Sequence, residues 1–267
     1  MDPFWTALSL TALAGASTAL GGALGAVGRP ISGRGLAVAL GLAAGVMVTV
    51  SLAEMMPAAG EGLAAGVGSA GGLAAVAALL AGAGAYLLLE HLVPEPTPPV
   101  PGDVVGPAAP DGTGVAARRM ARLGAVTAVA IAAHNLPEGF VTFAGALEDP
   151  SVGLALAVAM AVHNVPEGIA VAVPVRTATG SRRRAFTWAA VAGIAEPAGA
   201  LVGYLVLAPF LTPAVLGAVY ALVSGVMVTL SLHALLPEAQ RAGGLTPALL
   251  GALSGIAVML VSLDLLA

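Results

Sequence analysis

The stretch Gly45-Val-Met-Val-Thr-Val-Ser-Leu-Ala-Glu-Met-Met-Pro57 recurs near the end of the chain as Gly225-Val-Met-Val-Thr-Leu-Ser-Leu-His-Ala-Leu-Leu-Pro237. Between these copies lies a second pair, Ala133-His-Asn-Leu-Pro-Glu-Gly139 and Val162-His-Asn-Val-Pro-Glu-Gly168. All four segments lie in apolar runs long enough to be helices that cross a membrane. The arrangement of the helices therefore depends on how many crossings separate the two members of each pair.

The composition of the chain predicts an all-α polytopic membrane protein. Hydrophobic residues make up 58% of it and charged residues only 9%, and the mean hydropathy is +0.98. A soluble domain carries about 25% charged residues, so this chain has too few to cover a water-facing surface, and it has no basic surface for nucleic acid. Cysteine is absent, which excludes disulfides, thiolate metal sites and cysteine nucleophiles.

Eight apolar runs have the length that a membrane-spanning helix needs, which is about 20 residues. They extend over Phe4–Val27, Gly35–Ala59, Val67–Leu89, Arg122–Leu147, Val152–Val175, Ala185–Ala208, Pro213–Glu238 and Leu245–Leu266. The runs are continuous and rich in Ala, Leu and Gly, whereas the strands of a membrane β-barrel are shorter and alternate in polarity. We expect residues 1–267 to form one transmembrane domain with no separate soluble domain.

The arginines predict the orientation of this eight-span arrangement. All ten basic residues are Arg, and they lie in the connections between spans 1 and 2, 3 and 4, 5 and 6, and 7 and 8. These residues are Arg29, Arg34, Arg118, Arg119, Arg122, Arg176, Arg182, Arg183, Arg184 and Arg241. With eight spans the four connections share one side, which the positive-inside rule assigns to the cytoplasm. Both termini are then expected outside.

The longest connection, Pro94–Ala117, contains seven prolines and several glycines. This composition is typical of a flexible or polyproline-like linker with no core of its own. We therefore expect a cytoplasmic tether there.

The span numbers show the sense in which each repeated segment crosses the membrane. The first pair matches span 2 with span 7, and the second matches span 4 with span 5. In each pair one member is odd-numbered and the other even-numbered, so the two cross the membrane in opposite senses. This is the pattern of inverted-topology repeats, which in transporters place the substrate site at the repeat interface near the middle of the bilayer.

A short set of polar residues lies inside the predicted spans. The set comprises Glu54, His134, Asn135, Glu138, His163, Asn164, Glu167, Glu196 and His233. It includes both Asn residues of the chain and three of its four His residues. An ionisable side chain at the bilayer centre costs about 2.5–3.5 kcal/mol on insertion scales, so residues of this kind indicate a functional site by default.

The spacing within the second repeat indicates the chemistry. His134 and Glu138 are four residues apart and lie on one face of a helix, and Asn135 adjoins Glu138 at a spacing of three. The second copy places His163, Asn164 and Glu167 in the same way. Imidazole nitrogen together with amide and carboxylate oxygen suits Zn²⁺ and its first-row neighbours, whereas Mg²⁺ and Ca²⁺ prefer oxygen alone.

Each of these residues taken singly has a simpler explanation. A lone His or Asn in a membrane helix usually makes an interhelical hydrogen bond, and a lone Glu beside Pro fits a proton relay. Such explanations do not account for two identical His-Asn-x-Pro-Glu-Gly motifs. Glu54 and His233 lie toward the ends of their spans, where a functional role and simple contact with water explain a polar residue about equally well. Met47 and Met227 are expected to pack rather than to bind metal.

At these motifs the chain resembles the ZIP family of divalent-metal transporters, in its bacterial broad-specificity branch. The matching segments follow the family's order through spans 4 to 7, and they are His134–Gly139, His163–Gly168, Glu196–Gly199 and Ser231–Pro237. The resemblance implies a 3+2+3 arrangement of eight helices, with spans 4 and 5 as a central pair between two related groups of three.

The resemblance also implies a two-metal site between helices 4, 5 and 6. One ion would be held by His134, Glu138, His163 and Glu167. The second would be held by Asn135, Glu138, Asn164, Glu167 and Glu196. His233 looks like the family's exit-side histidine, and here it is followed by Ala234 where family members often have an acid.

We expect uptake of Zn²⁺ toward the cytoplasm, with Fe²⁺, Mn²⁺, Co²⁺ and Cd²⁺ as further candidate cargoes and no cofactor. The ion would step between the adjoining sites and leave past His233 and Glu54. Two alternatives stay open, a membrane-embedded metalloenzyme acting as a hydrolase and a proton-coupled carrier of an organic cation. The duplicated site favours transport, and the His-Glu-x-x-His motif of zinc proteases does not occur.

The predicted location is the bacterial cytoplasmic (inner) membrane, as a multi-pass protein. The expected partners are divalent metal ions and the lipid bilayer, with no nucleic acid. The oligomeric state is open, with a homodimer as one expectation.

Overall fold

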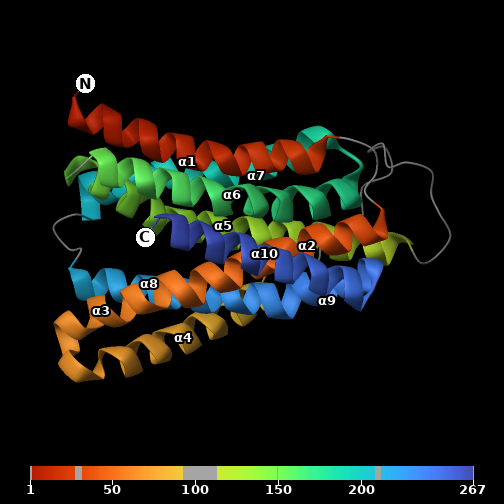
Figure 1. Ribbon diagram of the computed structural model, residues 1–267. Helices are drawn as coiled ribbons and strands as arrows, with labels where there is room; N and C mark the ends of the chain where they lie inside the picture. The colour runs from red at the N-terminus through yellow and green to blue at the C-terminus, as the bar shows by residue number, and fades with distance from the viewer. Residues whose placement is uncertain (1, 28–31, 93–112, 149, 208–211, 267) are drawn as a thin grey trace.

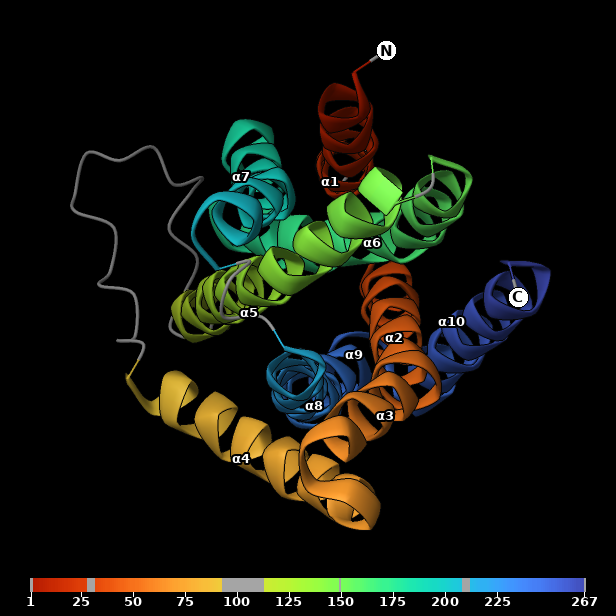
Figure 2. The same cartoon turned by 90° about the vertical axis from the view of Figure 1, so that its left-hand side faces the viewer.

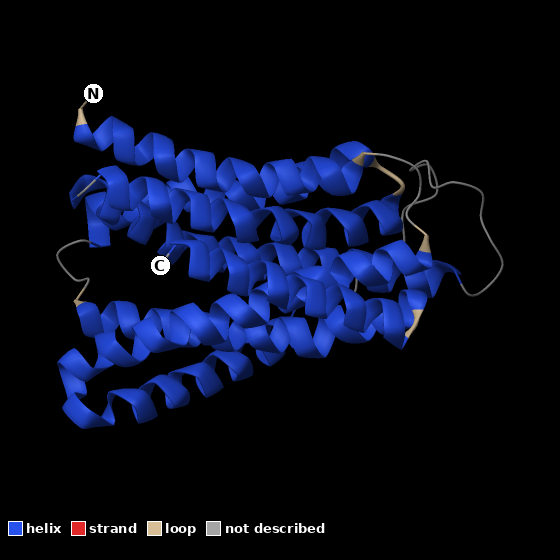
Figure 3. Ribbon diagram, in the orientation of Figure 1, coloured by secondary structure: helices blue, strands red, loops and turns tan. Residues whose placement is uncertain are grey.

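Helices account for almost all of the chain that the structure describes. The computed structural model describes residues 2–27, 32–92, 113–148, 150–207 and 212–266, and no strand occurs among them (Figures 1 and 3). The α-helices are α1 Pro3–Ala26, α2 Gly33–Val50, α3 Met56–Val67, α4 Gly71–Leu92, α5 Thr113–Glu148, α6 Pro150–Thr179, α7 Arg182–Val202, α8 Pro213–Thr229, α9 Leu236–Gly243 and α10 Leu245–Leu266. Short π-helical or 3-10 segments join some of them, namely η1 Ser51–Met55, η2 Gly68–Ala70, η3 Gly203–Leu207 and η5 Leu230–Leu235.

Six helical stretches within the described residues are long and apolar enough to cross a membrane. They are Pro3–Ala26, Gly33–Leu92, Leu156–Thr179, Arg182–Leu205, Pro213–Gly243 and Leu245–Asp264. Apolar side chains such as Leu73 and Leu205 point outward from the bundle, 75% and 71% exposed, as a lipid-facing surface requires. The predicted class, an all-α polytopic membrane protein, is confirmed.

The second stretch is two antiparallel helices rather than one. A straight helix over the 60 residues of Gly33–Leu92 would be about 90 Å long. The chain reverses at Gly68, whose φ of +61° lies in the left-handed region that a residue without Cβ adopts at little cost. As a result α4 returns beside α3 (Figure 1).

The helix at the fourth predicted span begins earlier than expected. α5 starts at Thr113 rather than at Arg122, so Thr113–Ala117, the end of the predicted linker, is helical. Hydropathy alone misplaces this boundary, because Arg118, Arg119 and Arg122 continue the helix beyond its apolar part. Residues 93–112, the rest of that linker, lie outside the described residues.

Viewed along its axis, the bundle consists of two groups of helices (Figure 2). α1, α5, α6 and α7 contact one another in the first group, which carries the paired His-Asn-x-Pro-Glu-Gly motifs. In the second group α2 packs on α10, and α8 packs on α3 and α4. The groups meet chiefly where α2 contacts α6 and where α5 contacts α8.

In the first group α1 and α7 cross at a pair of glycines. A Cβ built on Gly15 would overlap the carbonyl oxygen of Gly193, and a Cβ on Gly193 would overlap that of Gly15. Two backbones that approach this closely need small residues at the crossing, as in many membrane helix pairs.

Both copies of the long repeat contain the same local distortion of the helix. η1 and η5 are π-helical turns at matching positions, and each precedes a proline of the repeat, Pro57 or Pro237. Since proline has no amide hydrogen to donate to the carbonyl four residues back, the helix widens for one turn. The amides of Met56 and Leu236 then donate to the carbonyls of Ser51 and Ser231 five residues earlier.

The helix ends that carry arginine gather at one end of the bundle. The loop segments beside α1 and α2, between α6 and α7, and between α9 and α10 all lie at the right-hand end of Figure 3. α1 begins and α10 ends at the opposite end (Figure 1).

Candidate functional site

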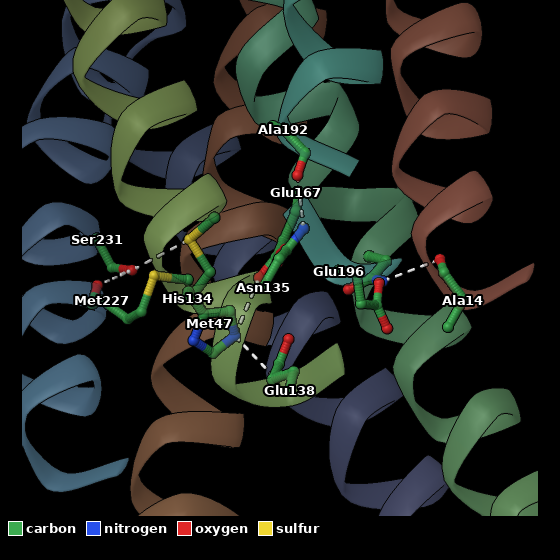
Figure 4. A network of polar contacts seen from close by, with 11 residues as sticks. Ala14, Met47, His134, Asn135, Glu138, Glu167, Ala192, Glu196, Met227 and Ser231 are labelled. Atoms are coloured by element: carbon green, nitrogen blue, oxygen red, sulfur yellow. Dashed lines mark hydrogen bonds and ion pairs between the residues drawn. The ribbon is translucent and has the colours of Figure 1, made fainter. Parts of the chain in front are cut away.

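Six of the seven metal ligands expected from the sequence are buried within the first group of helices. Figure 4 labels all of them except Asn164. α5 contributes His134, Asn135 and Glu138, α6 contributes Asn164 and Glu167, and α7 contributes Glu196. None of these six residues is more than 3% exposed. So many buried ionisable groups are costly unless they are paired or hold an ion.

His134 joins the two copies of the motif. Its Nε2 lies 2.8 Å from Oε1 of Glu138, one turn away on the same helix. The same Nε2 lies 3.8 Å from Oε1 of Glu167 on α6. The spacing of four within the motif therefore brings imidazole and carboxylate together as predicted, and the packing of α5 on α6 adds the second carboxylate.

The two asparagines are oriented by backbone carbonyls. Asn135 Nδ2 donates to the carbonyl of Ala192 on α7 at 3.1 Å, and Asn164 Nδ2 donates to that of Ala14 on α1 at 3.0 Å. Asn164 Nδ2 also lies 2.7 Å from Oε2 of Glu196. Because these partners only accept, the amide nitrogens must face them.

The amide oxygens consequently point away from these carbonyls. Asn135 Oδ1 and Asn164 Oδ1 are both buried, and neither has a hydrogen-bond partner among the described residues. Leaving a buried acceptor unpaired costs about 1–3 kcal/mol. The two oxygens are therefore suited to a ligand that accepts lone pairs, as a cation does.

Glycine and proline bring the backbones close enough for these contacts. A Cβ on Gly139 would overlap the carbonyl oxygen of Glu196, so only glycine allows α5 to approach α7 beside the site. Pro137 and Pro166 lie inside α5 and α6, and each leaves the carbonyl four residues back without its usual helical donor.

The backbone of His163 lies within α6, but its side chain is outside the described residues, so its expected role stays a prediction. Among the described side chains, no three His, Asp or Glu residues form a cluster that holds a metal ion as it stands. The expected ligand sets also include the side chain of His163 and the amide oxygens of Asn135 and Asn164.

Glu54 and His233 lie on opposite sides of the middle of the bundle, and their expected role on the exit path stays a prediction. His233 Nε2 lies 3.3 Å from Oε2 of Glu90, in a cavity beside Arg119 at the arginine-bearing end. Glu54 lies about 32 Å along its helix from Gly33 at that end and about 20 Å from the other. The two copies of the long repeat run in opposite directions, which separates the two side chains along the axis of the bundle.

Sequence reasoning misses a polar cluster beside His233. Glu238 of α9, 4% exposed, accepts from two nitrogens of Arg119 of α5, at 2.7 and 2.8 Å, and lies 3.4 Å from Arg241. These residues line a cavity of about 260 Å³ that also borders Tyr86 and Glu90. The positions of Glu238 and Glu90 at span ends predict only solvation, and nothing in their spacing indicates that they meet Arg119 or His233.

Comparison with known proteins identifies the relatives of this chain. The family model for the ZIP zinc transporter matches residues 107–263. The chain is 44% identical over 263 residues to the zinc transporter ZupT of Corynebacterium aurimucosum, covering 97% of this chain and 96% of that protein. It is 46% identical over 259 residues to ZupT of Corynebacterium efficiens, covering 96% of each chain. ZupT of Chlorobium luteolum is 44% identical over 279 residues, with both chains fully covered.

Proposed function

Since the chain belongs to the ZIP zinc transporter family, we propose that it carries divalent transition-metal ions, zinc foremost, toward the cytoplasm of a bacterial cell. The observation that carries this proposal is the meeting of the two His-Asn-x-Pro-Glu-Gly motifs in the middle of the bundle, where His134 contacts carboxylates of both copies. The residues supply the nitrogen and oxygen ligands that zinc takes in proteins.

The proposed site is binuclear. The first ion is held by His134, Glu138, His163 and Glu167. The second is held by Asn135, Glu138, Asn164, Glu167 and Glu196. The buried amide oxygens of Asn135 and Asn164 support the second set, because a bound cation would satisfy both. Fe²⁺, Mn²⁺, Co²⁺ and Cd²⁺ are further candidate cargoes, since such ligands discriminate weakly among first-row ions.

The proposed fold is an eight-span bundle of 3+2+3 helices with inverted repeats. In this arrangement the central pair is α5 and α6, which correspond to each other. In the two groups of three, α1 corresponds to α7 and α4 corresponds to α10. The continuous helical segment of α2 and α3 corresponds to that of α8 and α9. The packing supports this exchange, because the α1–α6 contact then matches α7–α5 and the α2–α10 contact matches α8–α4. The π-helical turns at Ser51–Met55 and Leu230–Leu235 support it as well.

The proposed route follows from the positions of the charges. The arginine-bearing end faces the cytoplasm by the positive-inside rule, so Glu54 lies on the entry side of the buried site and His233 on the exit side. An ion passes from Glu54 toward Glu138, exchanges water for the buried ligands, and leaves toward His233 and Glu90. The location is the bacterial cytoplasmic (inner) membrane, with both termini outside.

The chain belongs to a family of transporters, which excludes the alternative of a membrane-embedded metalloenzyme. The organic-cation carrier differs from the metal transporter in one measurable respect, which is stabilisation of the purified protein by zinc. Zinc at micromolar concentration should raise the melting temperature, because a ligand that binds only the folded state stabilises it.

The direct test is zinc uptake into proteoliposomes by Glu138→Ala and Glu167→Ala variants. Both should abolish uptake, since each removes a carboxylate assigned to both ions, while the protein still assembles in the membrane. Glu61→Ala is the matched control because Glu61 is an exposed acid on α3, and it should transport normally. Normal zinc uptake by either site variant would contradict the proposal.

A further inference from the structure

The polar contacts of the site occur in symmetry-related pairs. The donors Asn135 and Asn164 hold the same position in the two His-Asn-x-Pro-Glu-Gly motifs, and their backbone acceptors are Ala192 and Ala14. A pseudo-symmetry operation that exchanges α5 with α6 and α7 with α1 therefore superimposes one hydrogen bond on the other. The same exchange relates the glycines that cross at residues 15 and 193, because each directly follows one of these two alanines.

This exchange assigns a counterpart to Glu196. A Cβ on Gly139 would overlap the carbonyl oxygen of Glu196, and a Cβ on Gly168 would overlap that of Thr18. Gly139 and Gly168 are the last residues of the two motifs, while Thr18 and Glu196 each follow, by one helical turn, the alanine that accepts from an asparagine. Thr18 of α1 thus occupies the position in one half that Glu196 occupies in the other.

The hydroxyl of Thr18 is fully buried and has no hydrogen-bond partner among the described residues. A threonine in a helix normally donates to the carbonyl four residues back. For Thr18 this is the carbonyl of Ala14, which already accepts from Asn164 Nδ2 and from Ser17 Oγ. Thr11, which is equally buried on the same helix, does donate to its carbonyl, that of Ala7, at 3.0 Å.

Under the same exchange, the pair Asn135 and Thr18 corresponds to the contacting pair Asn164 and Glu196. Asn135 Oδ1 is also buried without a partner among the described residues. A hydroxyl both donates and accepts, whereas an amide oxygen only accepts, so one water molecule can serve both groups. Thr18 is shorter than Glu196, so a water molecule beside its hydroxyl would take the place that the longer carboxylate occupies in the other half.

We propose that Thr18 and Asn135 form a neutral half-site opposite the Asn164–Glu196 half, where they hold a water molecule bound to the partly hydrated cation. Thr18 is in this sense a positioning residue for the cargo. The inference rests on the proposed function, since it assigns a further residue to the same site. It makes the second metal position asymmetric, because α7 supplies the carboxylate of Glu196 where α1 supplies the hydroxyl of Thr18 with its water.

The test compares three single variants by direct Zn²⁺ binding to the purified full chain and by zinc uptake into proteoliposomes. Thr18→Val removes the hydroxyl and nearly keeps the shape, so it should weaken zinc binding and raise KM for uptake by about tenfold, the equivalent of one hydrogen bond. Thr18→Ser restores the hydroxyl and should return both values to within about twofold of the unmodified chain. Thr11→Val, the control, breaks a hydrogen bond away from the site and should change neither value.

A merely structural role for Thr18 predicts a lower melting temperature without metal and an unchanged zinc affinity. That result, or an equal loss of affinity in the Val and Ser variants, would overturn the inference. If Thr18→Val does not assemble, Thr18→Ala replaces it with the same expectation. If the unmodified chain neither binds nor transports zinc, the proposed function itself fails; if it does both and Thr18→Val matches it, only the present inference fails.

Discussion

Each of the two site asparagines has a different environment, although their motifs are identical. Asn164 donates to a backbone carbonyl and also contacts the carboxylate of Glu196, whereas Asn135 donates to a carbonyl alone. The second contact is a hydrogen bond to a charged group, which contributes about 1.5–3 kcal/mol. The amide at position 164 therefore holds Glu196 in place, and the amide at 135 does not.

Asn164→Asp should accordingly destabilise the metal-free protein by about 1.5–3 kcal/mol, because a carboxylate replaces the donor beside Glu196. Zinc should recover the loss, since two adjacent carboxylates bind a cation more tightly than one. Thermal unfolding with chelator and then with zinc measures both effects. Asn135→Asp is the control and should lose less stability without metal. Equal losses in the two variants would contradict the assignment.

At the scale of the helix, α5 belongs to one group of helices but is tied to the other near its first turns. Arg119 of α5 makes two contacts with Glu238 of α9, and Arg122 donates to the backbone carbonyl of Glu90 on α4. Glu238 is nearly buried, and removing the partner of a buried charge is costly. The early start of α5 at Thr113 makes this possible, because it extends the helix beyond the apolar segment to the level of α9.

Arg119→Ala should lower the stability of the protein by roughly 1–2 kcal/mol, a value reduced from that of a fully buried pair because the Arg119 side chain is 45% exposed. Arg118→Ala, at the neighbouring position on α5, is the control and should have little effect. Thermal unfolding of both variants in the same detergent checks this, and a similar loss in the two would show that charge alone, and not the Glu238 contact, stabilises this end.

At the scale of the whole molecule, the arrangement assigns each end of the bundle to one side of the membrane. The turn between α3 and α4 lies at the end where α1 begins, and the arginine-bearing helix ends lie at the other (Figure 1). The absence of cysteine makes this testable, because any introduced cysteine is the only one in the chain.

Cysteine at Ser69, exposed in the α3–α4 turn, should react with a membrane-impermeant maleimide added to intact cells. Cysteine at Gln240, exposed on α9, should react only after the membrane is permeabilised. Gel-shift labelling of the two variants checks the orientation. The reverse labelling pattern would place the arginines outside and invert the proposed direction of uptake.

The sequence predicts the helices and the central polar residues well, for a physical reason. Apolar runs and buried polar motifs are local properties, so the apolar helices and the meeting of His134 with Glu138 follow directly from spacing. Spacing does not predict the end of the bundle toward which Glu54 lies, since this depends on how the two antiparallel copies of the long repeat pack in space. Thr18 is missed from the sequence because a threonine in an apolar helix ordinarily donates to the carbonyl four residues back. Here that carbonyl, of Ala14, already accepts from Asn164 and Ser17.

The position of the site halfway along the helices has an electrical consequence. His134 and Asn164 lie near the middles of α5 and α6, and Glu196 lies near the middle of the helix that α7 forms with η3. An ion bound among them has therefore crossed about half of the transmembrane voltage. Each elementary charge moved through 100 mV changes the free energy by about 2.3 kcal/mol. For a doubly charged ion over half the field, an interior-negative potential of 100 mV therefore favours loading from outside by about 2.3 kcal/mol, roughly a fiftyfold gain in apparent affinity.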